Sequence, residues 1–243
     1  MAEKSDDTCG VSFLVHGPSK AGKSFLGDSA PGPRLFLDAE GNTRFLRSKK
    51  IKWDPSGPPP SYDGSWETCV VRIRDFSTLS YAYQWLATGQ HPFRSVIIDS
   101  ISETQQRCID AIAGTEALKM QDWGTLLRHM SAEIRKFRDL LDHPTNPLDT
   151  IVFTAMTKVG QDGKSYPFVQ GQLAVALPYY IDVISYIKAE ISETGEFTNY
   201  LLTKPHQLYE AGDRTGIYPQ VITNPRIDDM YNMFCNPENE VTS

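Results

Sequence analysis

A glycine-rich segment near the amino end carries the strongest chemical signal in this sequence of 243 residues. Residues 17–24 (GPSKAGKS) complete the pattern GxxxxGK[ST]. Glycines let backbone N–H groups surround phosphates, while Lys23 would neutralise the β- and γ-phosphates and the Ser24 hydroxyl would ligate Mg²⁺. The pattern therefore predicts a nucleoside triphosphate site. The alternative is a chance match, which we expect in roughly one chain in a hundred of this size.

The surroundings of this loop fit the prediction. Residues 11–16 (VSFLVH) form an apolar run typical of a buried strand, and a short helix over about 22–27 can follow the loop. Lys20 would either contact phosphate or remain a solvated lysine. The residues that we expect to contact the nucleotide are Gly17, Pro18, Ser19, Lys20, Ala21, Gly22, Lys23, Ser24 and Phe25.

Two carboxylates stand where a phosphate-binding loop needs them. Asp99 closes the apolar run SVIID and would hold the metal shell together with Ser24. Its alternative role is that of a helix N-cap, which Ser100 could fill instead. Glu40 follows the run at 34–38 (RLFLD) and could polarise the attacking water. The alternative for Glu40 is a turn carboxylate without a catalytic role.

Apolar runs that alternate with helical patterns must position these residues. We expect helices over 77–88, from Ser100 to about Ala113, and in a long segment that Asp122 caps and Pro144 ends. Residues 197–202 and 208–210 are expected to form a late β-hairpin. The fold class is α/β, with a mostly parallel central sheet flanked by helices. The expected strands lie at 11–16, 34–38, 68–73, 95–99, 150–155 and 182–187.

Length and composition favour one folded domain. Residues 11–234 hold the periodic patterns, between a polar tail at 1–10 and an acidic tail at 235–243. The net charge of −6 argues against a protein that coats nucleic acid over its whole surface, but it permits a local basic groove. The sequence has no apolar run of 18 residues and a polar, acidic start, so we expect no membrane span and a cytoplasmic location.

The cysteines and histidines predict no disulfide and no zinc site. Cys9, Cys69, Cys108 and Cys235 form no CxxC pair, so free thiols are expected. The five histidines show neither HxxxH nor HExxH spacing.

Taken together, GPSKAGKS, FLDAEG at 36–41 and VIIDS at 96–100 resemble the core of RecA-type P-loop ATPases. In that group the glutamate of the DAE sequence is the catalytic carboxylate, which matches Glu40, and the acidic residue of the second nucleotide motif matches Asp99. Residues 120–130, 168–187 and 213–225 are further similar to small phage-encoded RecA-like ATPases that act in single-strand annealing recombination. The resemblance covers roughly residues 11–234.

The resemblance implies a RecA-like fold, use of ATP and Mg²⁺, and DNA-stimulated hydrolysis. It also implies binding of single-stranded DNA, a single-stranded DNA-binding protein as partner, a homo-oligomer on DNA, and the host bacterial cytoplasm as location. The sequence shows no clear polymerisation segment and no DNA-binding lobe of full-length RecA, so stable filaments and true strand exchange are not expected.

The loop at 157–172 is the first predicted DNA contact, because in RecA-like folds the corresponding loop faces DNA. Lysines meet phosphates and rings stack on bases, so a cation-plus-aromatic mixture suits a single strand. The alternative is a β-hairpin with a turn at QDGK. Gln170 or Gln172 would sense the γ-phosphate, or serve as helix-start residues. The predicted contacts are Lys158, Lys164, Tyr166 and Phe168.

Two further basic groups have predicted roles. Residues 44–52 include Lys49 and Lys50 and contain no acid, so they are a second DNA candidate or simply a solvated face. Arg214, or else Lys204, would reach the γ-phosphate of a neighbouring subunit as basic residues do in oligomeric RecA-type motors. The alternative for Arg214 is a turn salt bridge with Asp213.

Three functions compete at this point. The first is a recombination ATPase that binds single-stranded DNA and promotes annealing. The second is a nucleotide-switched replication or recombination adaptor without significant turnover. The third is a small-molecule kinase, which the sequence disfavours because it shows no arginine-rich lid.

Overall fold

The central sheet is continuous across the chain. The structure, a computed structural model, describes residues 9–191 and 195–237, so most of the two predicted tails lies outside this part. Within it, nine strands follow the order β12-β10-β9-β1-β6-β5-β2-β4-β3, and β11 pairs with β9 beside this path. The strands are β1 (Val11–His16), β2 (Arg34–Asp38), β3 (Lys50–Lys52), β4 (Thr68–Arg72), β5 (Ser95–Asp99), β6 (Thr150–Ala155), β9 (Val183–Ile191), β10 (Phe197–Leu202), β11 (Gly212–Asp213) and β12 (Val221–Thr223).

Parallel pairing runs without a break from β9 through β1, β6, β5, β2 and β4 to β3. β10 and β12 extend the other end of the sheet in antiparallel pairing. Because parallel strands end at the same edge, the ends of β1, β2 and β5 lie together, and Asp38 pairs in register with Asp99. This carboxyl edge is therefore where the predicted site must form.

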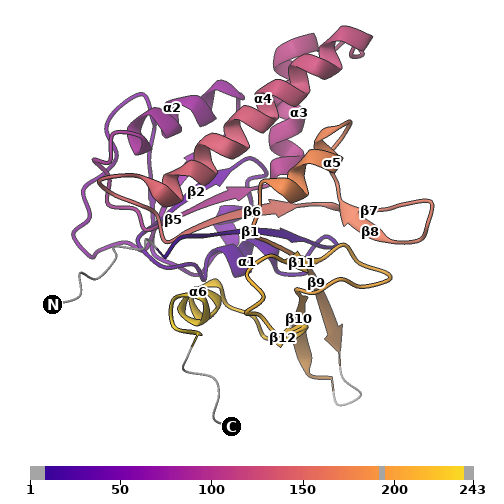
Figure 1. Cartoon of the computed structure of the whole chain (residues 1–243). Coiled ribbons are helices and arrows are strands. Elements are labelled where there is room, and N and C mark those ends of the chain that lie inside the picture. The colour runs from indigo at the N-terminus through magenta and orange to yellow at the C-terminus, as the bar shows by residue number, and fades with distance from the viewer. Residues whose placement is uncertain (1–8, 192–194, 238–243) are drawn as a thin grey trace, which may run out of the picture.

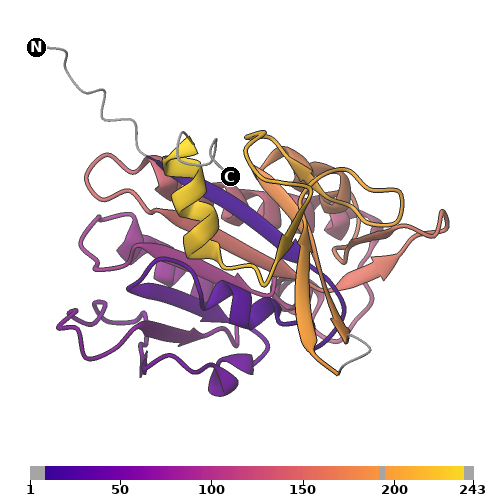
Figure 2. The same cartoon turned by 90° about the horizontal axis from the view of Figure 1, so that it is seen from below.

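Helices cover both faces of the sheet (Figure 1). Those on one face are α2 (Ser77–Leu86), α3 (Ile101–Ala113), α4 (Met120–Arg138) and α5 (Leu173–Ala176). On the other face lie α1 (Lys23–Gly27) and α6 (Ile227–Cys235), and Figure 2 shows α6 crossing the underside of the sheet. Short 3₁₀ turns are η1 (Asn42–Phe45), η2 (Asp139–Asp142) and η3 (Leu177–Tyr179). No described helix has both the length and the hydropathy to cross a bilayer.

The apolar strands fill two cores because successive side chains point to opposite faces. Leu35, Leu37 and Ile98 pack in the larger cluster under α2, α3 and α4. Phe36 and Ile97, their neighbours in sequence, pack in the cluster under α1 and α6. A parallel sheet covered on both faces explains why these strands are continuous apolar runs, and the predicted α/β class with a mostly parallel, helix-flanked sheet is confirmed.

Two predicted elements differ in detail. The late hairpin exists, but β10 pairs with β9 and β12 rather than with 208–210. The long helix begins at Met120, with Lys119 as N-cap, and Asp122 lies in its first turn, where the carboxylate accepts from the Lys119 backbone N–H at 2.7 Å. The helix ends at Arg138, before Pro144, and continues as the 3₁₀ turn η2. An acidic residue in the first helical turn and one at the N-cap look alike in sequence.

The two ends of the folded chain meet at the amino side of β1. Cys9 and Cys235 form a disulfide across 226 residues, so the prediction of free thiols is wrong for this pair. Cys69 and Cys108 are free and buried, as expected. Cys235 is the last residue of α6 and belongs to the folded part rather than to the predicted tail.

Candidate nucleotide site

The phosphate-binding loop (residues 17–24) joins β1 to α1 at the carboxyl edge of the sheet, as predicted. Gly17 is packed so tightly that a Cβ there would lie 2.4 Å from the carbonyl oxygen of Ile187 on β9. Gly22 has φ +91°, a left-handed conformation that side chains other than glycine rarely adopt. Both glycines are thus required by the backbone path of the loop.

Lys23 lies at the start of α1 with its ammonium group folded into the loop. Its Nζ donates hydrogen bonds to the carbonyl oxygens of Gly17 and Pro18, at 2.9 and 2.8 Å. Partial burial lowers the pKa of Lys23, while the carboxylates of Glu40 and Asp99 oppose this shift. The cation is therefore held within the loop close to both predicted acids.

Asp99 receives the Ser24 hydroxyl, which donates to Asp99 Oδ2 at 2.6 Å. The other carboxylate oxygen accepts from Thr154 on β6, a residue that the sequence did not single out. Burial raises the pKa of Asp99, the two hydrogen bonds counter that shift, and the charges of Glu40 and Asp38 add to it. Ser100, not Asp99, caps α3, because its Oγ accepts from the Glu103 backbone N–H at 3.3 Å.

Glu40 sits in a turn that Asp38 shapes. The Asp38 carboxylate is buried, accepts from Gly41 N–H at 2.6 Å and from Thr43 Oγ1 at 2.6 Å, and also pairs with Arg72. Each oxygen of Glu40 also accepts a hydrogen bond, Oε1 from Ser100 Oγ at 2.5 Å and Oε2 from Asn42 Nδ2 at 2.7 Å. These contacts hold Glu40 beside the loop.

One cavity of about 610 Å³ brings these groups together. Most of the predicted nucleotide contacts line it, while Ala21 is buried and does not. The lining from the predicted set is Gly17, Pro18, Ser19, Lys20, Gly22, Lys23, Ser24, Phe25, Glu40 and Asp99. The lining that sequence reasoning missed is Asn42, Phe45, Leu46, Met156 and Thr157. Two apolar residues, Phe45 and Leu46, interrupt the basic run at 44–52. This interruption is the one sequence feature that could have indicated that they line a pocket.

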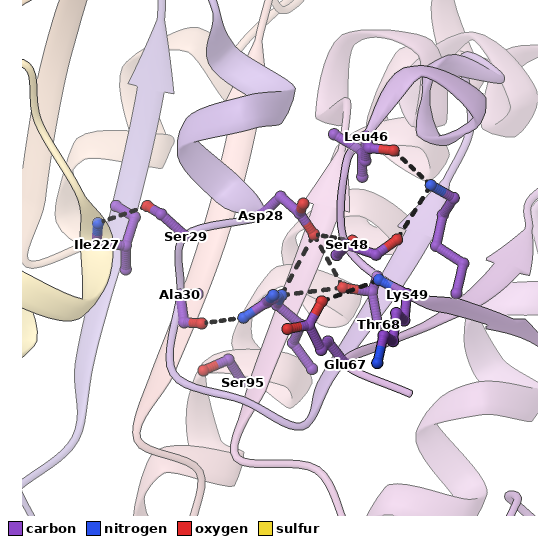
Figure 3. Close-up of polar contacts among 12 residues, drawn as sticks. Asp28, Ser29, Ala30, Leu46, Ser48, Lys49, Glu67, Thr68, Ser95 and Ile227 are labelled. Atoms are coloured by element: carbon purple, nitrogen blue, oxygen red, sulfur yellow. Dashed lines mark hydrogen bonds and ion pairs between the residues drawn. The ribbon is translucent and has the colours of Figure 1, made fainter. Parts of the chain in front are cut away.

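A polar network anchors the helix behind the loop (Figure 3). Asp28, just after α1, accepts from Ser48 Oγ and from Thr68 Oγ1, both at 2.8 Å, and pairs with Arg34. It joins α1 to the segment after Leu46 and to β4. The wall formed by Phe45 and Leu46 is thereby held at a fixed place relative to the loop.

Arg214 and Lys204 do not reach this cavity within the subunit. Arg214 follows β11, and its guanidinium contacts Asp182 Oδ1 at 3.5 Å and the carbonyl oxygen of Tyr179 at 3.2 Å. Asp182 in turn accepts from Ser12 near the start of β1, so Arg214 lies at the amino edge of the sheet, opposite the loop. Lys204, rather than Arg214, pairs with Asp213, at 2.8 Å.

The loop at 157–172 forms a hairpin of β7 (Thr157–Val159) and β8 (Ser165–Pro167) that projects from the carboxyl edge (Figure 1). Its polar groups have partners: Lys158 Nζ donates to the carbonyl oxygen of Val169 at 3.2 Å, Lys164 pairs with Glu210 at 2.5 Å, and Tyr166 OH donates to Asp162 at 2.6 Å. The Phe168 side chain is 39 % exposed.

The two lysines predicted from the basic run at 44–52 lie away from the hairpin, although Phe45 and Leu46 of the same run line the cavity. Lys49 and Lys50 are exposed on or next to β3, the edge strand four positions from β6. At a strand spacing of about 4.8 Å this is roughly 19 Å from the hairpin's parent strand. Lys49 and Lys50 therefore do not form one surface with the predicted contacts of the hairpin.

The donor set fits Mg²⁺. A serine hydroxyl and a carboxylate meet at 2.6 Å beside the loop, and Mg²⁺ prefers oxygen ligands, keeps several waters, and takes few ligands from the protein. Among the described residues no group of three or more His, Cys, Asp or Glu forms a dedicated metal cage.

Comparisons with known proteins give one family match. A family model described as an AAA domain matches residues 10–215. Among solved structures, the flagellar accessory protein FlaH from Methanocaldococcus jannaschii is similar at 11% sequence identity and a TM-score of 0.45, over 89% of this chain and 87% of that chain. No curated protein matches.

Proposed function

This chain belongs to the AAA domain family. We propose that it is an ATPase that binds single-stranded DNA and promotes single-strand annealing. Its P-loop ATPase core accounts for nucleotide binding. DNA stimulation, annealing and a phage origin belong to the proposal. They are supported by the similarity of residues 120–130, 168–187 and 213–225 to phage recombination ATPases.

The observation that carries the ATPase part is the meeting of four groups at one cavity. Ser24 Oγ lies 2.6 Å from Asp99 Oδ2, and Lys23 and Glu40 line the same space. A cation for the phosphates, oxygen ligands for a metal and a carboxylate for water are the parts that phosphoryl transfer to water requires. The four groups come from three different parts of the fold, namely α1, the turn after β2, and the end of β5. A purely structural role for such a cluster is the weaker explanation.

In this proposal each residue has one task. Backbone N–H groups of the loop and Lys23 bind the phosphates, and Lys23 leaves the carbonyl oxygens of Gly17 and Pro18 to do so. Glu40 orients the attacking water and accepts its proton. When bound, Mg²⁺ neutralises developing phosphate charge, and Ser24 and Asp99 are the residues that would hold it.

The apolar side of the cavity suits the nucleobase. Phe25 and Phe45 are 51 % and 60 % exposed, and Leu46 and Met156 complete the wall. Exposed rings beside a polar phosphate site are typical of a base platform, because ligand pockets combine apolar walls with a few polar groups. We propose that the base stacks on Phe45, with Phe25 beside it.

The hairpin at 157–172 is the better DNA candidate because it projects next to the cavity that Met156 and Thr157 line. Lys158 lies 5.9 Å from the centre of the Phe168 ring, so a cation and a stacking surface stand together. Lys164 and Glu210 form an ion pair in which both side chains are partly exposed, so Lys164 can exchange this partner for a phosphate contact.

Assembly on DNA into a homo-oligomer, with a single-stranded DNA-binding protein as partner, is also part of the proposal. Arg214 and the phosphate-binding loop lie at opposite edges of the sheet. A head-to-tail contact places opposite faces of neighbouring subunits together. Such an assembly would bring Arg214 toward the next subunit's γ-phosphate.

The test measures ATP hydrolysis and binding to an oligonucleotide across a salt series. We expect single-stranded DNA to stimulate turnover, Lys158→Ala and Phe168→Ala to weaken binding, and affinity to fall steeply with salt. Arg138→Ala, at the far end of α4, is the matched charge control. Loss of binding in Lys50→Ala with normal binding in Lys158→Ala would move the DNA surface to the edge strand β3.

One observation favours the adaptor without turnover. Both oxygens of Glu40 already accept hydrogen bonds, from Ser100 and Asn42, so neither is free for water in this state. ATP binding with no hydrolysis under any DNA condition would decide for the adaptor. Phosphate transfer to a metabolite would instead indicate a kinase.

A further inference from the structure

The side-chain amide of Gln105 on α3 forms hydrogen bonds with both backbone groups of Gln170. Its Oε1 accepts from Gln170 N–H at 2.6 Å, and its Nε2 donates to the Gln170 carbonyl oxygen at 3.1 Å. The side chain is 1 % exposed, and its two hydrogen bonds to Gln170 are of the kind that a neighbouring β-strand would make. A buried amide that satisfies both backbone groups of one residue fixes that residue firmly, since an unpaired buried group is costly.

Ser102, one turn earlier on α3, makes a second set of hydrogen bonds to the hairpin segment. Its Oγ donates to the Phe168 carbonyl oxygen at 2.7 Å and accepts from the Met156 backbone N–H at 3.0 Å. The Phe168 backbone N–H closes the loop by donating to the Met156 carbonyl oxygen at 2.7 Å. The two ends of the hairpin are thus tied to each other and to α3.

The same helix begins at the nucleotide edge. Its N-cap Ser100 donates to Glu40, and Asp99 directly precedes that cap. The other side of the hairpin also touches the cavity, because Met156 and Thr157 line it. Thr157 Oγ1 is moreover 3.1 Å from Nδ1 of the buried His16, which precedes the phosphate-binding loop. A movement of Glu40 or Asp99 would therefore act on α3, the helix that carries Ser102 and Gln105.

We propose that Ser102 and Gln105 are positioning residues that make the placement of the hairpin segment 156–170 depend on the nucleotide bound at the catalytic edge. This inference rests on the proposed function, because it treats the hairpin as the DNA contact of the same ATPase. The first turns of α3 act as one rigid element: Ser100 faces Glu40, and Ser102 and Gln105 hold the hairpin. Neither positioning residue touches the reacting atoms.

The test compares amide hydrogen exchange in the hairpin with and without a non-hydrolysable Mg·ATP analogue. In the wild type we expect the analogue to change exchange at Met156 and Gln170, whose N–H groups report directly on Ser102 and Gln105. Gln105→Met removes the amide at similar volume. It should raise Gln170 exchange about tenfold and abolish the response to the analogue.

Two further variants separate this role from a general loss of structure. Gln106→Met is the matched control, since Gln106 is exposed on the next position of α3 and bonds only Asp110 of its own helix. Ser102→Ala should lose the Met156 response, and Ser102→Thr, which keeps a hydroxyl, should restore it. An analogue response in Gln105→Met and Ser102→Ala equal to that of the wild type, or no response in the wild type, overturns the inference.

Measurements of ATP turnover with and without single-stranded DNA distinguish a failure of this inference from a failure of the proposed function. In Gln105→Met we expect turnover without DNA to stay within about twofold of the wild type, while stimulation by single-stranded DNA is lost. If wild-type protein shows no turnover or no stimulation, the proposed function fails, and the exchange experiment still decides the role of the two residues. Full stimulation in Gln105→Met would count against coupling through α3.

Discussion

Asp99 is buried where its charge costs stability, and we propose that it serves cation binding. Its carboxylate is 1 % exposed at the end of β5, where burial raises its pKa, and Ser24 and Thr154 hold both oxygens. Ionisable groups with shifted pKa values are concentrated at functional sites. A buried carboxylate beside other acids is therefore typical of a site that binds a cation. The residue is thus better suited to the loaded site than to the empty one.

Replacing this carboxylate should have opposite effects on stability and binding. With a raised pKa in the folded state, stability falls as pH rises through the ordinary range of aspartate toward the folded pKa. Asp99→Asn removes that loss, so we expect a higher unfolding midpoint at neutral pH without ligand. We also expect Mg·ATP affinity to drop about tenfold to a hundredfold. Urea unfolding and nucleotide titration check both.

The exposed Asp142 provides the control for this prediction, since Asp142→Asn should change neither quantity. A variant Asp99→Asn that is less stable at neutral pH and binds Mg·ATP normally would show that the carboxylate is structural.

His16 gives a pH prediction of its own. Burial lowers its pKa to about 4, and its ring nitrogens contact Thr157 Oγ1 and the Glu210 carbonyl oxygen. Since the unfolded state binds a proton below about pH 6.5, stability should fall between pH 6.5 and 4, by up to about 3 kcal/mol. In His16→Asn the decrease between pH 7 and 4.5, measured by urea unfolding, should be smaller. An equal decrease in both proteins would rule out His16 as its source.

Among the elements, the loop between β1 and α1 depends most closely on residue size. Gly17→Ala would place a Cβ 2.4 Å from the Ile187 carbonyl oxygen, so the loop or β9 must shift. We expect a loss of about 1–3 kcal/mol in the free energy of unfolding. Gly57→Ala, where a Cβ meets nothing within 4 Å, should stay within about 0.5 kcal/mol. Equal effects in both variants, measured by denaturant unfolding, would contradict the tight packing.

The sequence predicted the elements whose signals are local. β1, β2, β5 and β6 are short apolar runs with the expected bounds, and the Ser100 cap starts α3 where the capping pattern indicates. The strand pairing of β10 and the roles of Gln105 and Thr154 depend on contacts between distant segments. No local pattern specifies such contacts, so these features could not be predicted from the sequence.

At the scale of the whole molecule, the net charge of −6 coexists with local basic groups. Lys49 and Lys50, at the β3 end of the run at 44–52, lie about four strands from the hairpin at 157–172, and Arg214 lies at the opposite edge from the loop. A single subunit therefore presents separate basic surfaces rather than one groove. Contact with DNA at more than one of them requires either a long strand or neighbouring subunits.

The disulfide between Cys9 and Cys235 predicts how the chain ends contribute to stability. Closing a loop of 226 residues restricts the unfolded chain, which is typically worth about 2–4 kcal/mol. Reductant should therefore lower the unfolding midpoint of the wild type to that of Cys9→Ser, and should leave Cys9→Ser unchanged. Titration of four free thiols in unreduced, unfolded protein would contradict this pairing.

The central claim is that Glu40 activates water for hydrolysis of ATP bound at the phosphate-binding loop. Its most direct test is steady-state Mg·ATP hydrolysis, with nucleotide affinity measured in parallel, for wild type, Glu40→Gln, Lys23→Ala and the exposed control Glu116→Gln. We predict that Glu40→Gln loses at least about a hundredfold in turnover while keeping its affinity, and that Lys23→Ala loses affinity. Wild-type turnover in Glu40→Gln would contradict the claim.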